Sequence, residues 1–92
     1  MVEGRITIGE VPVRAGWIEF HPAGNTVGNF DSAELAHDGS YRAVRVPVGE
    51  LMVRIVQTQP PVPATYANFA SPLRFRAKPG RDNRFDVDCQ SR

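Results

Sequence analysis

Few side chains of this sequence could take part in catalysis. Cys89 with His21 or His37 is the only pairing of a cysteine nucleophile with a histidine base. Such a pair needs hydrogen-bond contact and a third group that orients the base. Cys89 falls in phase with Phe85 and Val87 on the predicted inward side of the last strand, which is typical of a small buried residue. We therefore expect no catalytic residues and a protein that is not an enzyme.

Carboxylates are more numerous, but their spacing resembles no calcium loop. The aspartates that could supply oxygen ligands are Asp31, Asp38, Asp82, Asp86 and Asp88. The single cysteine excludes an internal disulfide and a cysteine-based zinc site. Lys78 is the only lysine and lies on a polar face beside a turn, whereas an isopeptide bond needs a buried lysine. We expect no metal and no cofactor.

A binding function has better candidates in the stretch "WIEFH". Strand alternation places Ile18 and Phe20 on one side and Trp17, Glu19 and His21 on the other. An exposed aromatic ring beside polar groups can stack on a sugar or anchor a protein contact. Alternatively, Trp17 covers the sheet edge or packs beneath a loop. Trp17, Glu19 and His21 form the predicted ligand-binding site.

Length and charge limit the class of protein. The 92 residues fit a single domain, residues 1–92, because so short a chain cannot bury two cores. The net charge is only +1, and the arginines alternate with carboxylates, which argues against nucleic-acid binding. No apolar run is long enough for a membrane span, and the start lacks the features of a secretory signal. The location is either cytoplasmic or, if a signal has been removed, extracytoplasmic in the cell envelope.

Alternation with a period of two recurs between turn clusters and predicts an all-β fold. We expect strands over residues 2–8, 17–21 and 30–36, with residues 9–16 as a connection. Asp38-Gly39 predicts a hairpin that returns at Tyr41. Residues 50–58 are apolar on both sides, which indicates a central strand covered on both faces.

Two predictions concern the last third of the chain. Residues 59–72 contain four prolines and should cross between the sheets as an extended, polyproline-like connection. "LRFRA" and "FDVDC" should then pair as a closing hairpin in which residue numbers sum to 162. That register sets Arg74 opposite Asp88, Arg76 opposite Asp86 and Phe75 opposite Val87, so both faces match.

The ordered motifs resemble those of the carboxypeptidase regulatory-like, or transthyretin-like, domains, most closely the small type abundant in planctomycete bacteria. The likeness covers almost the whole chain. It rests on Gly4, Asp38-Gly39-Ser40-Tyr41, Pro47-Val48-Gly49, Tyr66, Ser71-Pro72-Leu73, Pro79-Gly80 and Phe85-Asp86-Val87-Asp88. The resemblance implies a seven-stranded Greek-key β-sandwich without catalytic residues, often extracytoplasmic and carried on lipoproteins. The lipoprotein signal and its lipidated cysteine are missing from this sequence.

Three functions follow as hypotheses. The first is a structural or interaction module that meets a protein partner or a second copy of itself. The second is a carbohydrate-binding module centred on Trp17. The third is a hydrolase, because some transthyretin-like proteins hydrolyse 5-hydroxyisourate. Those enzymes end in Tyr-Arg-Gly-Ser, whereas this chain ends in "CQSR" and has its "SYR" at residues 40–42, in mid-chain.

Overall fold

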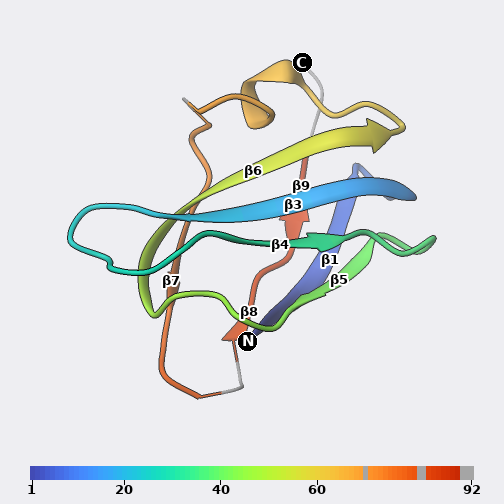
Figure 1. The fold of residues 1–92 in the computed structure, drawn as a ribbon. Coiled ribbons are helices and arrows are strands. Elements are labelled where there is room, and N and C mark those ends of the chain that lie inside the picture. Colours follow the sequence, from blue (N-terminus) through green and yellow to red (C-terminus); the bar gives the residue numbers. More distant parts are fainter. Residues whose placement is uncertain (70, 81–82, 90–92) are drawn as a thin grey trace.

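Two β-sheets pack face to face in the computed structural model of this chain (Figure 1). The structure describes residues 1–69, 71–80 and 83–89, and these contain strands and one short 3-10 helix but no α-helix. The all-β prediction is therefore confirmed. The elements are β1 (Val2–Ile8), β2 (Val11–Pro12), β3 (Ala15–Pro22), β4 (Asp31–Glu34), β5 (Ser40–Ala43), β6 (Gly49–Gln59), η1 (Ala64–Tyr66), β7 (Arg74–Ala77), β8 (Asn83–Arg84) and β9 (Val87–Asp88).

The four-stranded sheet has the order β4-β3-β6-β7, with every neighbouring pair antiparallel. Ile18 of β3 lies opposite Ile55 of β6, and Phe20 lies opposite Val53. These four side chains are fully buried, so one face of the sheet forms half of the core. Their neighbours in sequence point to the outer face, as the alternation predicted.

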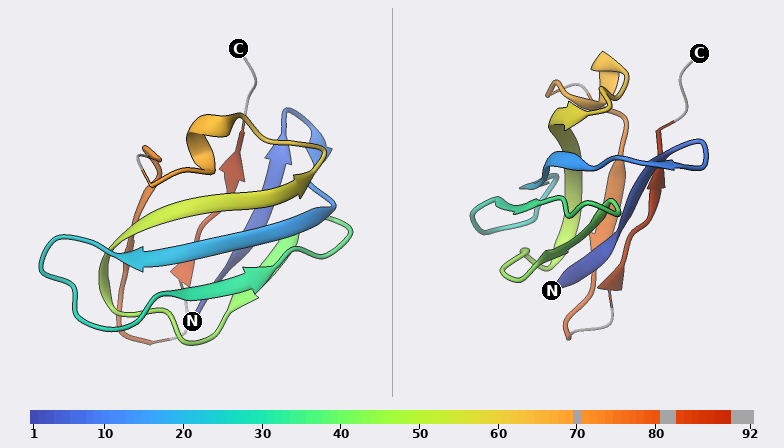
Figure 2. Two further views of the ribbon diagram at one scale, coloured as in Figure 1. Left: turned by 45° about the horizontal axis from the view of Figure 1, so that its top comes forward. Right: turned by 90° about the vertical axis from the view of Figure 1, so that its right-hand side faces the viewer.

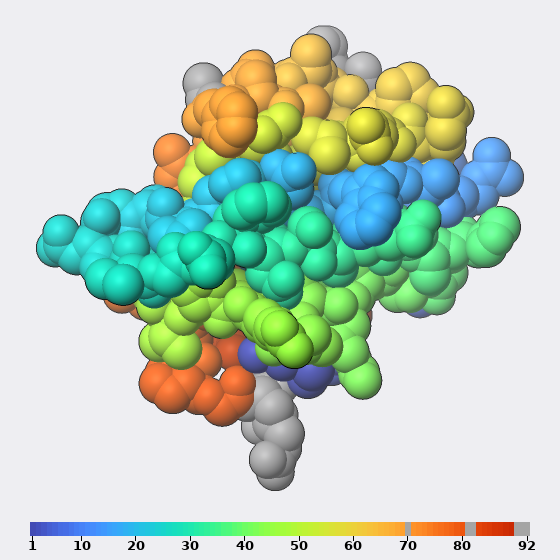
Figure 3. All heavy atoms as spheres, viewed as in Figure 1, coloured from blue at the N-terminus to red at the C-terminus, as the bar shows by residue number. Residues whose placement is uncertain are grey.

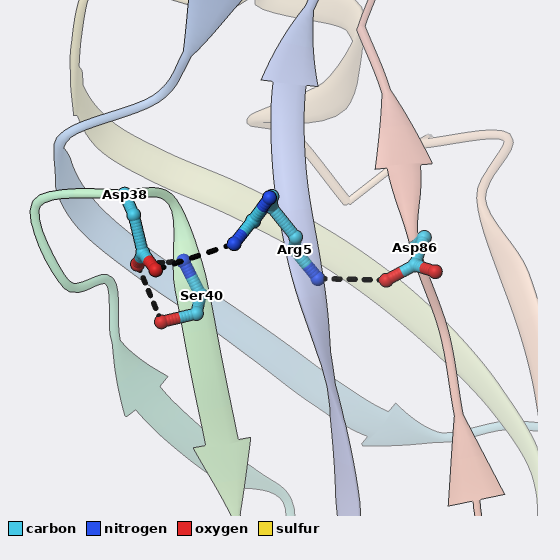
Figure 4. Close-up of polar contacts among 4 residues, drawn as sticks. All are labelled: Arg5, Asp38, Ser40 and Asp86. Atoms are coloured by element: carbon cyan, nitrogen blue, oxygen red, sulfur yellow. Dashed lines mark hydrogen bonds and ion pairs between the residues drawn. The ribbon is translucent and has the colours of Figure 1, made fainter.

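The five-stranded sheet is built around β1. One edge of β1 pairs with β5 and then with β2, and its other edge pairs in parallel with β8 and then with β9. Between β8 and β9, the Asp86 carboxylate accepts a hydrogen bond of 2.9 Å from the backbone N–H of Arg5 (Figure 4). A side chain thus replaces the missing main-chain acceptor. Because β5 and β2 lie end to end along one edge of β1, and β8 and β9 lie end to end along the other, the sheet is only three strands wide. The two sheets form separate layers (Figure 2).

The core lies between the two layers and contains apolar side chains from nearly every strand. The Phe20 ring packs near Tyr41 and Phe85, with ring centroids 5.9 and 6.5 Å apart. Cys89 is fully buried, which confirms its inward position. Val13 is also fully buried, although its segment was predicted to be a plain connection. That segment contains β2, which pairs with the end of β1.

The Asp38-Gly39 turn forms, but it does not create a two-stranded hairpin within one sheet. Gly39 has a φ of +82°, and its N–H donates to the carbonyl of Ala36 at 2.9 Å. The strands on either side then separate, because β4 pairs with β3 while β5 pairs with β1. The turn is therefore a corner between the two sheets, and the hairpin prediction is wrong on this point.

The prediction that the connection over residues 59–72 crosses between the sheets is wrong. It contains the 3-10 turn η1 and returns to the same sheet, where β7 pairs with β6 and Phe75 lies opposite Leu51. Arg54 anchors this segment, since its Nε donates to the carbonyl of Ala67 at 3.1 Å. A side chain of β6 thus keeps the connection on the outer face of its own sheet. That β6 is a central strand is confirmed, while its outer side chains are only half-buried.

The predicted closing hairpin is wrong in a different way. β7 pairs with β6, and β8 and β9 pair with β1, so Arg74 and Arg76 do not face Asp88 and Asp86 within the chain. The segment between them crosses between sheets. Asn83 organises this crossing, because its amide bonds to both the N–H and the carbonyl of Lys78. A short alternating sequence can pair with several different strands. Here each of the two segments pairs with a strand of a different sheet instead of with the other segment.

Candidate binding face

The outer face of the four-stranded sheet carries the residues that the sequence singled out. Ile18 and Phe20 are buried, so Trp17, Glu19 and His21 project to the opposite side of β3, as predicted. Figure 3 views the molecule from this side, with β3 between β4 and β6. We refer to the outer sides of β3 and β6 together with Phe30 and Phe69 as the aromatic face.

Glu19 is the centre of a charged network on the aromatic face. Its Oε1 lies 2.9 Å from Nε2 of His21 and 3.3 Å from Nη1 of Arg54. Arg54 lies directly opposite Glu19 in the β3–β6 ladder, which explains the contact. The three side chains are only 19–20% exposed. Since partial burial reduces screening by water, this network is held more firmly than a pair of fully exposed charges.

Aromatic rings surround this network at the His21 end. The His21 ring stacks on Phe30 with centroids 4.7 Å apart and planes 11° apart, and it meets Phe69 edge-on at 5.6 Å. The Arg54 guanidinium lies 4.0 Å above the centre of the Phe69 ring. Phe30 and Phe69 remain 53% and 70% exposed. Large aromatic surface is thus left accessible around a pre-positioned set of charges.

Trp17 lies at the other end of the face. Along β3, Trp17 is two residues from Glu19 and four residues from His21. Trp17 and His21 are therefore about 13 Å apart along the strand. Its neighbours in the ladder are Glu34 of β4 and Val56 of β6. Trp17 is 39% exposed, so it is neither sealed under a loop nor fully solvated. The face therefore presents aromatic surface at both ends and charge in the middle.

Sequence reasoning found three members of this face and missed three. The alternation of the predicted central strand could have placed the Arg54 side chain on the outer side of the sheet. Its pairing with Glu19, however, depends on the register between β3 and β6. Phe69 comes from the proline-rich connection, where no periodicity indicates direction, and Phe30, predicted as the first residue of a strand, directly precedes β4. Only the folded chain brings them beside His21.

A second group of charges surrounds the Asp38 turn and lines a shallow hollow of about 460 Å³. The Asp38 carboxylate accepts hydrogen bonds from the N–H and hydroxyl of Ser40, at 3.0 and 2.6 Å, and lies 3.3 Å from Arg5 (Figure 4). The Ser40 bonds, and then the nearby Arg5 charge, lower the pKa of Asp38. Another arginine of this hollow also faces a carboxylate, since Arg42 pairs with Glu3. The hydrogen bonds between Asp38 and Ser40 hold the turn in place.

The remaining candidates for chemistry do not converge. Cys89 faces the core between the sheets, and burial raises the pKa of its thiol from 9.0 to about 11. His21 is on the outer face of the other sheet, and His37 is exposed at the Asp38 turn. Within residues 1–69, 71–80 and 83–89, no cluster of three or more histidine, cysteine or acidic side chains could hold a metal ion. The candidate ligand Asp82 lies outside the described residues.

Comparisons with known protein families, with curated proteins and with solved structures each found no match for this chain. In the part of the chain that the structure describes, no helix is long and apolar enough to cross a membrane.

Proposed function

We propose that this chain is a non-catalytic interaction module that binds a protein partner through the aromatic face. The observation that carries the proposal is the exposure of Phe69, Phe30 and Trp17 on one side of a single sheet. Aromatic residues and arginine are enriched at the centres of protein interfaces. The network of Glu19, His21 and Arg54 orients this surface before any partner arrives, which lowers the entropic cost of binding.

The proposal includes membership of the transthyretin-like, carboxypeptidase regulatory-like class. Three rows in one sheet and four strands in the other support a seven-stranded sandwich, since β5 with β2 and β8 with β9 each occupy one row. The chain also crosses between sheets after β2, β4, β5 and β7, which agrees with Greek-key connections. A cell-envelope location and a single domain over residues 1–92 are parts of the same proposal and rest on the resemblance and on chain length.

The arrangement of the nucleophilic and basic groups supports a role without catalysis. The Cys89 thiol is buried in the core and its pKa is raised. The four-stranded sheet separates this thiol from His21, which lies on the outer face of that sheet. A hydrolase of the hydroxyisourate type would need histidines and an arginine gathered in one pocket. His21 does meet Arg54 through Glu19, but His37 lies apart from them, exposed at the corner between the two sheets.

An NMR titration tests the proposed protein contact. The isotope-labelled chain is mixed with the macromolecular fraction of a cell lysate depleted of small molecules. Shifts or broadening should concentrate on β3, β6 and residues 64–69, and should disappear in a Trp17→Ala/Phe69→Ala variant. Val11→Ala is the matched control, because it removes an exposed apolar side chain from β2, which belongs to the other sheet. Perturbation that survives in the double variant contradicts the proposal.

Carbohydrate binding is a second candidate because of the surroundings of Trp17. A half-exposed indole beside Glu34 offers a stacking surface with a hydrogen-bond acceptor next to it, a combination suited to a sugar ring. Titration with a glycan mixture should then quench Trp17 fluorescence and shift its side-chain NMR signal. A folded Trp17→Ala variant that keeps the glycan affinity excludes this function.

A further inference from the structure

We propose that the aromatic face binds a second copy of this chain, with the two faces packed against each other about a two-fold axis; this rests on the proposed function, because the second copy is the partner of the same surface. The register between β3 and β6 carries the proposal. Outward side chains of these two strands are complementary in three successive pairs of opposite residues. A two-fold axis repeats this complementarity between two copies.

The three pairs lie side by side on the outer side of β3 and β6. Each joins a ring or an acid on β3 to an aliphatic chain or a base on β6: Trp17–Val56, Glu19–Arg54 and His21–Met52. The residues that alternate with them, such as Phe20 and Ile55, are fully buried, which directs all six side chains outward. The two strands thus present different but matching chemistry to a surface that covers them.

Apolar surface of the aromatic face stays in contact with water in the single chain. The Phe69 side chain is 70% exposed, Phe30 is 53% exposed and Trp17 is 39% exposed. Figure 3 looks onto this surface, where β3 is blue and β6 is yellow-green to yellow. A second copy that covers both strands removes these rings from water, and this is the driving force of the association.

The charges of the aromatic face decide how the two copies are oriented. A two-fold axis that runs parallel to β3 and β6 and between them places β3 of one copy over β6 of the other. Glu19 then lies across from the Arg54 position of the second copy, so opposite charges face each other. An axis perpendicular to the strands places Glu19 over Glu19 of the second copy, and juxtaposed like charges are strongly unfavourable.

The charged side chains keep their own partners in this arrangement. Glu19 remains 2.9 Å from His21 and 3.3 Å from Arg54 of the same chain. These three side chains are already only 19–20% exposed, so covering them removes little further water. The charges therefore set the orientation, while the exposed rings supply the contact.

The same axis brings the phenyl rings of the two copies together. Phe30 directly precedes β4, on one side of β3, and Phe69 lies over Arg54 of β6, on the other side. Because the axis exchanges these two sides, Phe69 of one copy faces Phe30 and His21 of the other. Such an isologous contact uses the whole surface of both copies, so it closes as a dimer and does not continue as an open chain.

The size of the molecule limits the strength of this dimer. No flat face of a molecule that measures 32 × 25 × 17 Å is larger than about 800 Å², the area that each partner buries in an interface of standard size. The aromatic face is only a part of such a face. We therefore expect a weak dimer that forms between micromolar and millimolar concentration.

Sedimentation analysis of the purified chain up to millimolar concentration tests the association. A species of twice 10.2 kDa should appear as the concentration rises. Phe69→Asp should weaken the dimer by at least about tenfold, because it puts a charge in place of the most exposed ring of the face. Val11→Asp makes the same change in β2 of the other sheet and should leave the dimer intact. A dimer that is insensitive to Phe69→Asp overturns the proposal.

Nuclear Overhauser contacts between labelled and unlabelled copies test the orientation. The indole of Trp17 in one copy should contact the methyl groups of Val56 in the other. Contacts between Trp17 of one copy and His21 of the other would instead require an axis perpendicular to the strands, and they contradict the proposed geometry.

The lysate titration separates this proposal from the proposed function. A purified chain that stays monomeric at millimolar concentration, but whose aromatic face responds to the lysate, overturns the second copy as partner and leaves the proposed function standing. A monomeric chain whose aromatic face does not respond to the lysate contradicts both. A dimer that Phe69→Asp disrupts supports both.

Discussion

Gly4 lies where β1 approaches the break between β8 and β9 most closely. A Cβ atom added there would lie 2.7 Å from the carbonyl carbon of Phe85, closer still to its oxygen, and 3.0 Å from Oδ1 of Asp86. Two of the three neighbouring atoms belong to the backbone, which cannot turn aside as a flexible side chain can. We predict that Gly4→Ala separates β1 from this segment.

Three hydrogen bonds depend on that close approach. Phe85 donates to Glu3 at 3.0 Å, Arg5 donates to Asp86 at 2.9 Å, and the hydroxyl of Tyr41 donates to the carbonyl of Phe85. At about 1 kcal/mol each, their loss lowers the free energy of unfolding by about 3 kcal/mol. The reduced freedom of alanine in the unfolded chain offsets less than about 1 kcal/mol of this. A net loss of about 2–3 kcal/mol is a large part of the stability of a small domain.

Urea denaturation followed by fluorescence measures the change in the free energy of unfolding. Gly9→Ala is the matched control, because Gly9 has open space around it and only its φ of +63° opposes a side chain. Gly4→Ala should cost clearly more than this control. Tyr41→Phe isolates one of the three hydrogen bonds and should cost about 1 kcal/mol. Equal stability of the two alanine variants would refute the argument from close approach.

Three further predictions concern the core and the crossing between the sheets. Phe20→Ala empties a fully buried site between Tyr41 and Phe85 and should cost about 3–5 kcal/mol in the same assay, whereas a loss below about 1 kcal/mol contradicts the packing. The raised pKa of Cys89 means that the folded state favours the neutral thiol. The stability gained from keeping this thiol neutral is complete below pH 9.0 and is lost as pH rises toward about 11. Cys89→Ser should remove that part of the alkaline loss, and an unchanged profile argues against it. Asn83→Asp replaces amide donors that serve two carbonyl groups and should cost about 2 kcal/mol, while Asn83→Ser, which keeps one donor, should cost less.

Local patterns were sufficient to predict most of the strands and their inner faces. Alternation identified β1, β3 and β6, and it assigned Ile18, Phe20 and Cys89 to the core. The turn at Asp38-Gly39 was also found, since positive φ at a glycine is a local requirement. These features depend on residues close in sequence, whose preferences change little with the rest of the fold.

Strand partners could not be predicted in the same way. "RFRA" matches "FDVD" by charge and size, yet β7 pairs with β6, where Arg76 finds Glu50 as its partner. Several registers satisfy the same short alternating pattern, and the choice among them is made by packing of the whole core. The predicted hairpin is therefore wrong, although its first strand is present as β7 and part of its second as β9.

The binding face shows the same division. The sequence by itself determined that Trp17, Glu19 and His21 share one side of a strand, because successive side chains of a strand alternate. Only the tertiary structure decided that Arg54 lies opposite Glu19 and that Phe30 and Phe69 enclose His21. These neighbours come from another strand, a loop and a proline-rich connection. Their meeting depends on register and on long-range packing, which no local pattern encodes.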